Sequence, residues 1–364
     1  MQARGNTTAR TLDRLIGIPL LSAAGLFTRR RGIPDAVVNV AVISLGCIGD
    51  TLLLDGPLRD LLAVRPGCRV TLFTNNGNLA TGRLLDTVRE VIALPLANPL
   101  KAFRLLRQES FDVCIDAGQW ARVSALYALA ARSRHRIGFA TPGHHRHYAF
   151  DTVVDHLDSR HELDNFRALF APLGINGDRV PTVTPQKGIE LPKQPFAVFH
   201  MLPSGRKAHF KEWPEANWKA LAEHCAGRGI TVLLSGSPAD APRVEALAQS
   251  VGSPDVRSLA GRTGLAELAA LLRHARFVVS VNTGIMHLAA AVGAPLVSLN
   301  GPTSIMRWGA VTAPGKGIAL AADLPCAPCL HLGFEYGCSE SVCMRSITVE
   351  QVIEAAENLL QPAP

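Results

Sequence analysis

A strand-to-helix junction within residues 277–303 carries the residues best suited to bind a charged ligand. Its sequence is FVVSVNTGIMHLAAAVGAPLVSLNGPT, in which an apolar run leads through Asn282 and Thr283 into an Ala-rich helix. Asn and Thr are good helix N-caps, and Gly284 lets a ligand approach the backbone closely. The N–H groups of the first turn and the helix dipole favour a diphosphate, to which His287 can donate. We expect a diphosphate site here, and the alternative is ordinary capping above a core histidine.

A second turn, Gly301-Pro302-Thr303, follows the next apolar run, residues 296–299. Neighbouring parallel strands carry ligands at their carboxyl ends, so this turn is expected to open beside the first. We therefore expect these three residues to contact the same ligand.

A polar loop in residues 201–218, MLPSGRKAHFKEWPEANW, offers one hydroxyl and three cations: Ser204, Arg206, Lys207 and Lys211. It follows an apolar run and leads through Trp213-Pro214 into a helix with Pro near its first turn. A cation in such a loop can neutralise the charge that builds on a departing diphosphate. The alternative is a set of ordinary surface cations.

Residues 46–50, Gly-Cys-Ile-Gly-Asp, interrupt the first long apolar run, residues 37–45. The Gly-x-x-Gly spacing is weak evidence for a phosphate loop. Asp50 stands at the carboxyl end of the expected strand, where side chains meet ligands. A carboxylate there is suited to general base chemistry. Its alternative role is to cap a helix that begins at Thr51, and the two roles do not exclude one another.

Two further groups of residues could bind ligands. Basic residues between positions 132 and 147, among them Arg134 and Arg136, could bind a phosphorylated ligand, with Gly49 as a further candidate contact, or form a solvated loop. Four cysteines near the C-terminus have the spacing of a tetrathiolate site for zinc or iron, with His331 as an additional ligand. Reduced thiols or an adventitious disulfide are the alternatives. These cysteines are Cys326, Cys329, Cys338 and Cys343.

The elements that must position these residues alternate between strand and helix along the whole chain, which predicts α/β modules with parallel sheets. Expected elements include helices at residues 51–64 and 121–133, and a loop-rich basic stretch from 137 to 151. A Pro-rich linker separates two such modules. The expected parts are a basic, partly apolar arm (1–36), a first domain (37–178), a linker (179–195), a second domain (196–346) with a Cys-rich loop (326–343), and a C-terminal helix (347–364).

The net charge of +7 is unevenly distributed along the chain. Residues 1–36 hold six Arg against two Asp, so the remaining body is close to neutral and a broad nucleic-acid surface is not expected. The arm has an apolar stretch at residues 15–27, interrupted by Pro19 and shorter than the about 20 residues that span a bilayer. It predicts a short helix packed on the body, an interfacial membrane anchor, or a disordered tail. The cytoplasm is the expected compartment, with contact at the inner face of the inner membrane as an option.

Together these motifs resemble the signature of the family 9 glycosyltransferases, the heptosyltransferases of lipopolysaccharide assembly. Members typically carry a D-T-G-x-M-H-L-A-A-A stretch followed by G-P-T, and the junction at residues 282–303 is similar to it. The resemblance extends from residue 37 to the C-terminus. It includes the L-G-x-x-G-D turn that ends at Asp50, the Trp213-Pro214 pair and the R-I-G-F stretch that begins at Arg136.

This resemblance implies the GT-B fold, with two Rossmann-like domains facing across a cleft, and an inverting transfer from a nucleotide-activated sugar. It assigns the donor diphosphate to Thr283, Gly284 and His287, and the stabilisation of the leaving group to Lys211. It implies that Asp50 is the general base for the acceptor hydroxyl. The favoured donor is ADP-heptose and the favoured acceptor is a lipopolysaccharide core sugar, with no cofactor required for catalysis.

Two positions depart from the family pattern. Asn282 stands where most heptosyltransferases have an Asp that contacts the donor sugar, and its amide can donate as well as accept. Glu212 stands between Lys211 and Trp213, where a basic or aromatic residue is common. One alternative is a related transferase that uses another nucleotide sugar or a protein acceptor, similar to the autotransporter heptosyltransferases, which hold a metal with cysteines. A non-catalytic nucleotide- or metal-binding assembly module is another.

Overall fold

The structure is a computed structural model in which the chain forms two compact units, Met1–Pro181 and Thr182–Pro364. The boundary between them falls inside the Pro-rich segment at residues 179–195. Arg206 and His331, both singled out from the sequence, lie outside the described residues. The structure describes residues 7–27, 30–185, 189–205, 207–330 and 338–361.

The first unit is built on a six-stranded parallel sheet in the order β3-β2-β1-β4-β5-β6. This is the order of the Rossmann fold, which places the switch point between β1 and β4. The central strands are buried along almost their whole length, as parallel strands covered on both faces must be. The strands are β1 (Asn39–Ser44), β2 (Arg69–Thr74), β3 (Glu90–Ala93), β4 (Phe111–Asp116), β5 (Ser133–Ala140) and β6 (Thr152–Asp155).

Short helices connect these strands, and two of them differ from the expected boundaries. The helix expected at residues 51–64 is two helices, α2 (Ile48–Leu53) and α3 (Asp55–Val64), which Leu54 separates. Pro57 explains the break, since proline is tolerated in a first helical turn and not in a helix interior. The remaining helices of this unit are α4 (Leu79–Gly82), α5 (Pro99–Leu106), α6 (Arg122–Ala130) and α7 (Glu162–Phe170), with 3₁₀ turns η1 (Arg146–Ala149) and η2 (Ala171–Leu173).

Strand β5 corrects the expectation of a helix up to residue 133 followed by a loop. Helix α6 ends at Ala130, and Ser133 already pairs with Phe111 of β4. Along β5, buried His135 and Ile137 alternate with the more exposed Arg134 and Arg136, the period of a strand, and Gly138 and Phe139 are buried as well. The arginines between them disguised this alternation as a polar loop.

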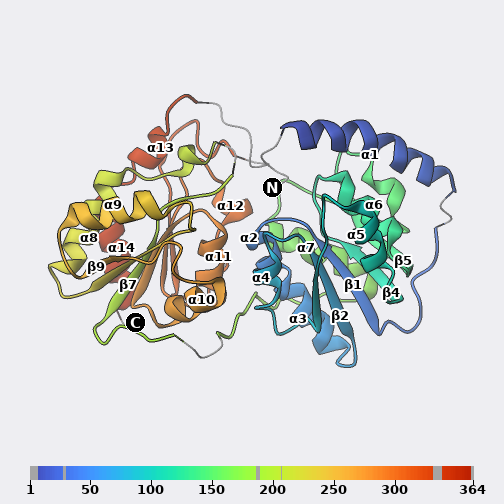
Figure 1. The fold of residues 1–364 in the computed structure, drawn as a ribbon, viewed down its shortest axis with the longest axis horizontal. Helices are drawn as coiled ribbons and strands as arrows, with labels where there is room; N and C mark the ends of the chain where they lie inside the picture. The colour runs from blue at the N-terminus through green and yellow to red at the C-terminus, as the bar shows by residue number, and fades with distance from the viewer. Residues whose placement is uncertain (1–6, 28–29, 186–188, 206, 331–337, 362–364) are drawn as a thin grey trace. The chain divides into compact units, whose positions relative to one another are not determined.

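Helix α1 (Thr7–Phe27) precedes the first sheet and continues through Pro19, so the expectation that this proline interrupts the segment is wrong. Proline removes the hydrogen bond to the carbonyl four residues earlier, that of Leu15. Leu15 is 66 % exposed, so water can satisfy that carbonyl. In Figure 1, α1 lies along the surface of the first unit beside α6.

None of the described helices, α1 included, is both long and apolar enough to cross a membrane.

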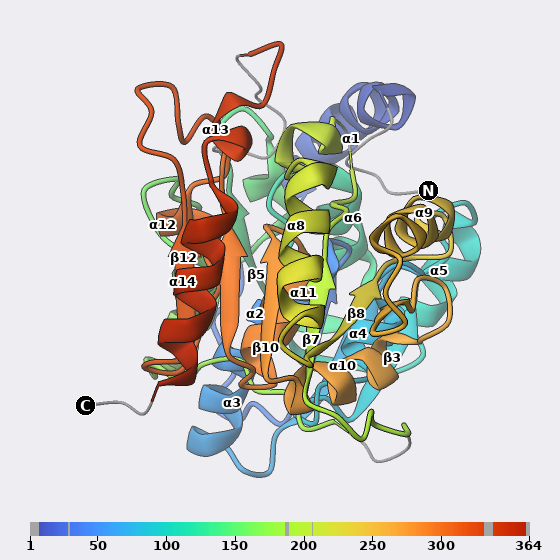
Figure 2. The same cartoon turned by 90° about the vertical axis from the view of Figure 1, so that its left-hand side faces the viewer.

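The second unit repeats the architecture with a parallel sheet in the order β12-β11-β10-β7-β8-β9. Figure 2 shows α8, α9 and α14 on one face of this sheet, with α10 and α11 behind it. The strands are β7 (Phe196–His200), β8 (Thr231–Ser235), β9 (Val256–Ser258), β10 (Phe277–Val281), β11 (Leu296–Leu299) and β12 (Gly317–Leu320). The helices are η3 (Ala208–Lys211), α8 (Glu215–Ala226), α9 (Ala241–Val251), α10 (Leu265–His274), α11 (Gly284–Ala291), α12 (Ile305–Trp308), α13 (Val342–Arg345) and α14 (Val349–Leu360).

The core of the second unit fixes the ends of the central strands. Buried Val, Leu and Phe side chains of β7, β8, β10 and β11 pack against α8, α9 and α14. Trp213 and Trp218 belong to this core, with ring centroids 5.0 Å apart. The loops that leave the carboxyl ends of β7, β10 and β11 are therefore held on a rigid base. Each of the two units is built on a six-stranded parallel sheet, and together they give the chain the GT-B fold.

Candidate active site

The junction between β10 and α11 has the geometry of a helix N-terminus that is open to a ligand. Thr283 is the N-cap, and its Oγ1 accepts hydrogen bonds from the N–H groups of Ile285 (3.2 Å) and Met286 (3.4 Å). The amides of the first turn are therefore not all available, contrary to the expectation from the sequence. In the described chain, no hydrogen bond uses the N–H groups of Thr283 and Gly284. These two N–H groups stand at the positive end of the helix dipole.

Lys211 brings a cation to this junction from a distant part of the chain. It is the last residue of η3, and its Nζ donates to the carbonyl oxygen of Asn282 at 3.4 Å. His287, one turn into α11, is buried. The structure thus brings together the Lys, the junction and the His that the sequence predicts, whereas it leaves Ser204 exposed in the loop after β7.

The backbone on either side of Lys211 is anchored to the C-terminal part of the chain. The hydroxyl of Ser341 donates to the carbonyl oxygen of Phe210 at 2.7 Å. The indole Nε1 of Trp213 donates to the carbonyl oxygen of Ile347 at 2.8 Å. Because both anchors are adjacent to the segment that carries the ammonium group, they restrict where Lys211 can point.

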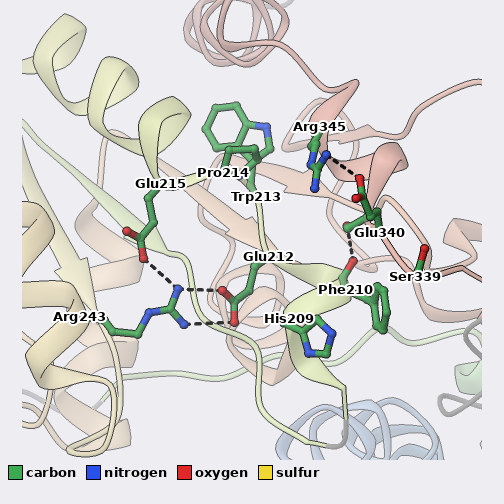
Figure 3. A pocket seen from close by; sticks show the side chains of 11 residues that line it. His209, Phe210, Glu212, Trp213, Pro214, Glu215, Arg243, Ser339, Glu340 and Arg345 are labelled. Atoms are coloured by element: carbon green, nitrogen blue, oxygen red, sulfur yellow. Dashed lines mark hydrogen bonds and ion pairs between the residues drawn. The ribbon is translucent and has the colours of Figure 1, made fainter.

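A third anchor is ionic and accounts for the unusual Glu212. Its carboxylate accepts two hydrogen bonds from the guanidinium of Arg243, at 3.2 and 2.8 Å, and Glu215 accepts a third at 2.9 Å. Figure 3 shows Arg243 pointing toward both carboxylates beside a hollow of about 330 Å³. The two carboxylates raise the pKa of Arg243 further above its ordinary value. Glu212 therefore faces α9, where it ties the Lys211 segment to Arg243.

The turn at residues 301–303 packs against the cysteine-bearing segment. A Cβ on Gly301 would lie 2.4 Å from Met344 Sδ and 3.1 Å from Cys343 Sγ, so a larger residue there would force Met344 to move. The carbonyl oxygen of Pro302 accepts from the N–H of Cys329 at 3.0 Å. Thr303 is buried, and within the described residues its hydroxyl has no hydrogen-bond partner. A polar ligand atom could satisfy that hydroxyl.

The four C-terminal cysteines carry free thiols, and the described chain holds no group of three or more His, Cys, Asp or Glu residues that could hold a metal ion. Burial raises the pKa of Cys343, and the nearby Cys329 and Cys338 raise it further. The tetrathiolate site stays a prediction, since residues 331–337 of this segment lie outside the described residues.

Asn282 uses its side chain within the protein. Its Nδ2 donates to Asn300 Oδ1 and to the carbonyl oxygen of Trp308, both at 3.0 Å. Asn300 in turn donates from Nδ2 to the carbonyl oxygen and hydroxyl of Ser298, which fixes its own oxygen toward Asn282. An aspartate at this position could not donate either bond. The residue that departs from the family pattern therefore matches its surroundings, because Asn300 and Trp308 supply the acceptors that the amide requires.

Asp50 lies in the first unit, on the first turn of α2 just after β1. The helix begins at Ile48 and not at Thr51, and Asp50 Oδ2 accepts from the N–H of Cys47 at 3.3 Å. A Cβ on Gly46 would lie 2.6 Å from the same oxygen, so the carboxylate packs directly over this glycine. Both the capping role and a position at the carboxyl edge of the sheet are therefore present, with buried Gly49 in the same turn.

Two asparagines that the sequence analysis missed hold this turn in place. Asn75 Nδ2 donates to the carbonyl oxygens of Leu45 and Gly46, at 2.8 and 3.3 Å. Asn78 Nδ2 donates to the hydroxyl of Thr51 at 2.7 Å. Both come from the loop after β2, the strand beside β1. Their position after a strand was the available signal.

Arg134 and Arg136 lie at the other edge of this sheet. Strand β5 is parallel to β1, and Arg134 is its second residue, whereas Asp50 follows the carboxyl end of β1. Arg136 donates from Nε to Asp151 at 3.0 Å. The structure therefore does not bring these arginines together with Asp50, and the hollow that they line is at the amino edge.

The carboxyl edge near β1 holds a different ion pair, between Asp116 and Arg146. Asp116 ends β4, and its Oδ2 lies 2.5 Å from Arg146 Nη2, with both side chains fully buried. Burial raises the pKa of Asp116, against the lowering effect of Arg146. The hydroxyl of Ser124 also donates to this carboxylate at 3.1 Å. An Asp that directly ends an apolar strand was the signal in the sequence.

The sequence profile of glycosyltransferase family 9 (heptosyltransferase) matches residues 100–339. Lipopolysaccharide heptosyltransferase 1 of Salmonella typhimurium is 28 % identical over 288 residues, which cover 73 % of this chain and 89 % of that protein. Lipopolysaccharide heptosyltransferase 1 of Pseudomonas aeruginosa is 41 % identical over 141 residues, which cover 38 % of this chain and 37 % of that protein.

Solved structures share the fold. The ADP-heptose lipopolysaccharide heptosyltransferase II of Escherichia coli superposes with a TM-score of 0.74 at 20 % identity, covering 89 % of this chain and 98 % of that one. The dodecameric iron-containing heptosyltransferase TibC, solved with ADP-D-β-D-heptose, gives a TM-score of 0.60 at 14 % identity, covering 90 % and 77 %.

The GT-B fold and a cation beside an open helix N-terminus suit an enzyme that binds a nucleotide sugar, and the profile match specifies the family. The chain belongs to glycosyltransferase family 9, the heptosyltransferase family, and is an enzyme of that class.

Proposed function

We propose that the chain transfers heptose from ADP-heptose to a sugar of the lipopolysaccharide core, with inversion at the anomeric carbon. The observation that carries the donor half of this proposal is the hydrogen bond from Lys211 Nζ to the carbonyl oxygen of Asn282. It puts an ammonium group beside a helix N-terminus, and both favour a diphosphate. The names of the relatives, which act in lipopolysaccharide assembly, support the choice of sugar and acceptor.

The donor diphosphate is assigned to the β10–α11 junction. The N–H groups of Thr283 and Gly284 bind its oxygens, Lys211 neutralises the charge, and His287 donates from the first turn of α11. The turn at residues 301–303 adds contacts, with Thr303 as the group whose hydroxyl lacks a partner in the described chain. The exposed Ser204 belongs to this set only if its loop bends toward the ligand.

Asp50 is assigned as the general base. It removes the proton from an acceptor hydroxyl while that oxygen forms a bond to the anomeric carbon. The bond between the anomeric carbon and the diphosphate oxygen breaks on the opposite side, and ADP leaves with the electron pair. Fixed cations and amide dipoles stabilise the negative charge on the leaving group. No step in this scheme passes through a metal, and the cysteine segment serves as an anchor for the Lys211 loop.

A screen of nucleotide sugars by thermal shift, followed by product analysis, tests the proposal. We expect ADP-heptose to raise the melting temperature and Asp50→Asn to keep that shift while losing about 10²- to 10⁴-fold in kcat, because only the base is removed. If only a UDP- or GDP-sugar raises the melting temperature, that nucleotide sugar and not ADP-heptose is the donor. Donor binding without turnover on any acceptor would instead favour a non-catalytic module.

The acceptor and the location are part of the same proposal. A core acceptor carried on a lipid would be presented at the inner face of the inner membrane, so a peripheral contact of this enzyme with that face is proposed. Transfer to a protein acceptor, as the alternative, would be detected as a mass increase on that protein and not on a core oligosaccharide.

A further inference from the structure

Helix α1 is docked on the first unit by one of its faces, which fixes the direction of the other. Asp13 pairs with Arg122 at 3.1 Å and also accepts from the backbone N–H groups of Arg122 and Val123. Leu21 is fully buried. A Cβ on Gly17 would meet the side chain of Arg122 at 2.7 Å, so the helix lies close against α6. The inner face of α1 is therefore well defined.

The opposite face of α1 is apolar and exposed. Five large side chains, each between 51 and 83 % exposed, recur at spacings of one to six residues that bring them to one side of the helix. A monomeric soluble protein rarely exposes so continuous an apolar patch unless it binds something. We call this the apolar stripe: Leu12, Leu15, Ile16, Leu20 and Leu26.

A hollow of about 670 Å³ at the amino edge of the first sheet is strongly basic. The one acidic residue on its wall, Asp112, already accepts from the N–H groups of Val38 and Asn39, both at 2.9 Å, and these bonds lower its pKa. Arg136 is paired with Asp151, and the other four arginines of the lining leave an excess of positive charge that can face an anion. We call this the arginine hollow: Arg31, Arg107, Arg132, Arg134 and Arg136.

The stripe and the hollow are linked through the segment that follows α1. The N–H of Arg31 donates to Asp151 Oδ1 at 3.0 Å, and Asp151 Oδ2 holds the guanidinium of Arg136. Arg31 lines the hollow and comes four residues after Phe27, where α1 ends. Four residues reach about 14 Å at most, so cationic and apolar surfaces meet at the same end of α1.

We propose that the apolar stripe and the arginine hollow together form a docking surface for an anionic lipid bilayer. The stripe enters the boundary between headgroups and acyl chains, and the hollow binds lipid phosphates. Charge complementarity selects this occupant over a second copy of the chain, since two arginine hollows would repel one another. The inference deepens the proposed peripheral location and does not depend on which sugar is transferred.

Co-sedimentation with vesicles tests this surface in the full-length protein. We expect binding to vesicles of equal parts phosphatidylcholine and phosphatidylglycerol, and weak binding to phosphatidylcholine alone. The double variant Leu15→Glu/Leu20→Glu should lower binding at least about tenfold. Each leucine that leaves water for the bilayer strengthens binding several-fold or more, and a glutamate does not. Arg31→Ala/Arg132→Ala should lower binding to the anionic vesicles by about tenfold while leaving binding to phosphatidylcholine unchanged.

Val342→Glu is the matched control, because Val342 is 50 % exposed in the second unit and outside the docking surface. It should bind as the wild type does. The thermal shift with ADP-heptose is measured on each variant, so that failure of the membrane surface is distinguished from failure of the donor site. Wild-type binding by the leucine variant would overturn the proposal. The proposal would also be overturned if the wild type were a dimer and the leucine variant a monomer. The apolar stripe would then bind a second copy of the chain.

Discussion

Lys211 Nζ lies 3.4 Å from the carbonyl oxygen of Asn282, although 71 residues separate them in the sequence. Asn282 directly precedes the N-cap of α11, so the ammonium group stands beside the positive end of a helix dipole. Two positive potentials at one place are unfavourable without an anion. The carbonyl oxygen offsets part of this cost, and a bound diphosphate would offset the rest.

Lys211→Ala should therefore lower kcat more than it weakens donor binding. The ammonium group counters charge that grows on the leaving oxygen, so its removal should cost about 10²- to 10³-fold in kcat. Steady-state kinetics with ADP-heptose and a core acceptor measure the split between kcat and KM. Lys219→Ala is the control, because this lysine forms an exposed pair with Glu223 on α8. A Lys211→Ala enzyme with unchanged kcat would remove the cation from the proposed mechanism.

Arg243→Ala tests whether the ionic anchor positions Lys211. Without the guanidinium, Glu212 loses two hydrogen bonds and the segment after η3 gains freedom. We expect kcat to fall several-fold, to about tenfold, with a smaller effect on the thermal shift by the donor, as for Lys211→Ala. Arg243→Lys should restore part of the loss, because it keeps the charge and not the paired geometry.

Arg262→Ala provides the comparison for this prediction. Arg262 pairs with Glu245, which lies on α9 as Arg243 does, but both side chains of this pair are largely exposed. Such a pair contributes about 0 to 1 kcal/mol, so no change in kcat is expected. If Arg243→Ala and Arg262→Ala behave alike, the anchor has no effect on Lys211.

Gly46→Ala should impair Asp50 without unfolding the first unit. The new Cβ would lie 2.6 Å from Asp50 Oδ2, which forces the carboxylate to move. We expect kcat to fall at least about tenfold, since a displacement of about 1 Å at a catalytic group is costly. Circular dichroism should show an unchanged fold. Gly67→Ala, where a Cβ meets nothing within 4 Å, should keep full activity, and equal losses in both variants would contradict the argument.

The sequence predicted the strand ends well and the local partners poorly. Residues 277–281 read as a buried strand because they are continuously apolar, and β10 has those bounds. The sequence offered both capping and an open helix N-terminus, and it could not show that Thr283 Oγ1 takes up the amides of Ile285 and Met286 while those of Thr283 and Gly284 stay open. That choice depends on the rotamer of Thr283, which the sequence pattern does not encode.

Long-range pairing is the other part that the sequence could not supply. Arg134 is basic, and its charge suggested contact with a phosphorylated acceptor. The strand that contains it was read as a loop, so the edge of the sheet on which it lies could not be derived. Asn75 and Asn78 were missed for the opposite reason. Their importance comes from the turn after β1 that they hold, about 30 residues earlier in the chain.

Asn282→Asp should destabilise the second unit, even though aspartate is the residue expected from the family pattern. The carboxylate would face Asn300 Oδ1 and the carbonyl oxygen of Trp308, two acceptors in a buried site. We expect the free energy of unfolding to fall by about 3 kcal/mol. Urea unfolding followed by tryptophan fluorescence reports on this unit through Trp213, Trp218 and Trp308.

Asn98→Asp is the control for that substitution. Asn98 accepts a hydrogen bond from the N–H of Lys101 as the N-cap of α5, and aspartate can accept it equally well. No loss of stability is expected there. An Asn282→Asp protein as stable as the wild type would show that Asn300 can reorient at no cost.

His200 should make the stability of the second unit depend on pH. It ends β7, and burial lowers its pKa to about 4, while its Nδ1 lies 3.0 Å from Ser235 Oγ. An unfolded histidine has a pKa of about 6.5, so between pH 6.5 and pH 4 the unfolded chain binds a proton that the folded chain does not. Stability is therefore present above pH 6.5 and is lost as the pH falls toward 4. The loss contributed by this residue should reach about 3 kcal/mol.

The measurement compares wild type with His200→Gln, which cannot titrate. Carboxylates titrate in both proteins, so their effect cancels in the difference between the two unfolding free energies. That difference should shift by about 3 kcal/mol in favour of the variant between pH 6.5 and pH 4. His209→Gln, at an exposed position, should track the wild type across the same range. A constant difference between wild type and His200→Gln would mean that His200 takes up its proton in the folded chain as easily as in the unfolded one.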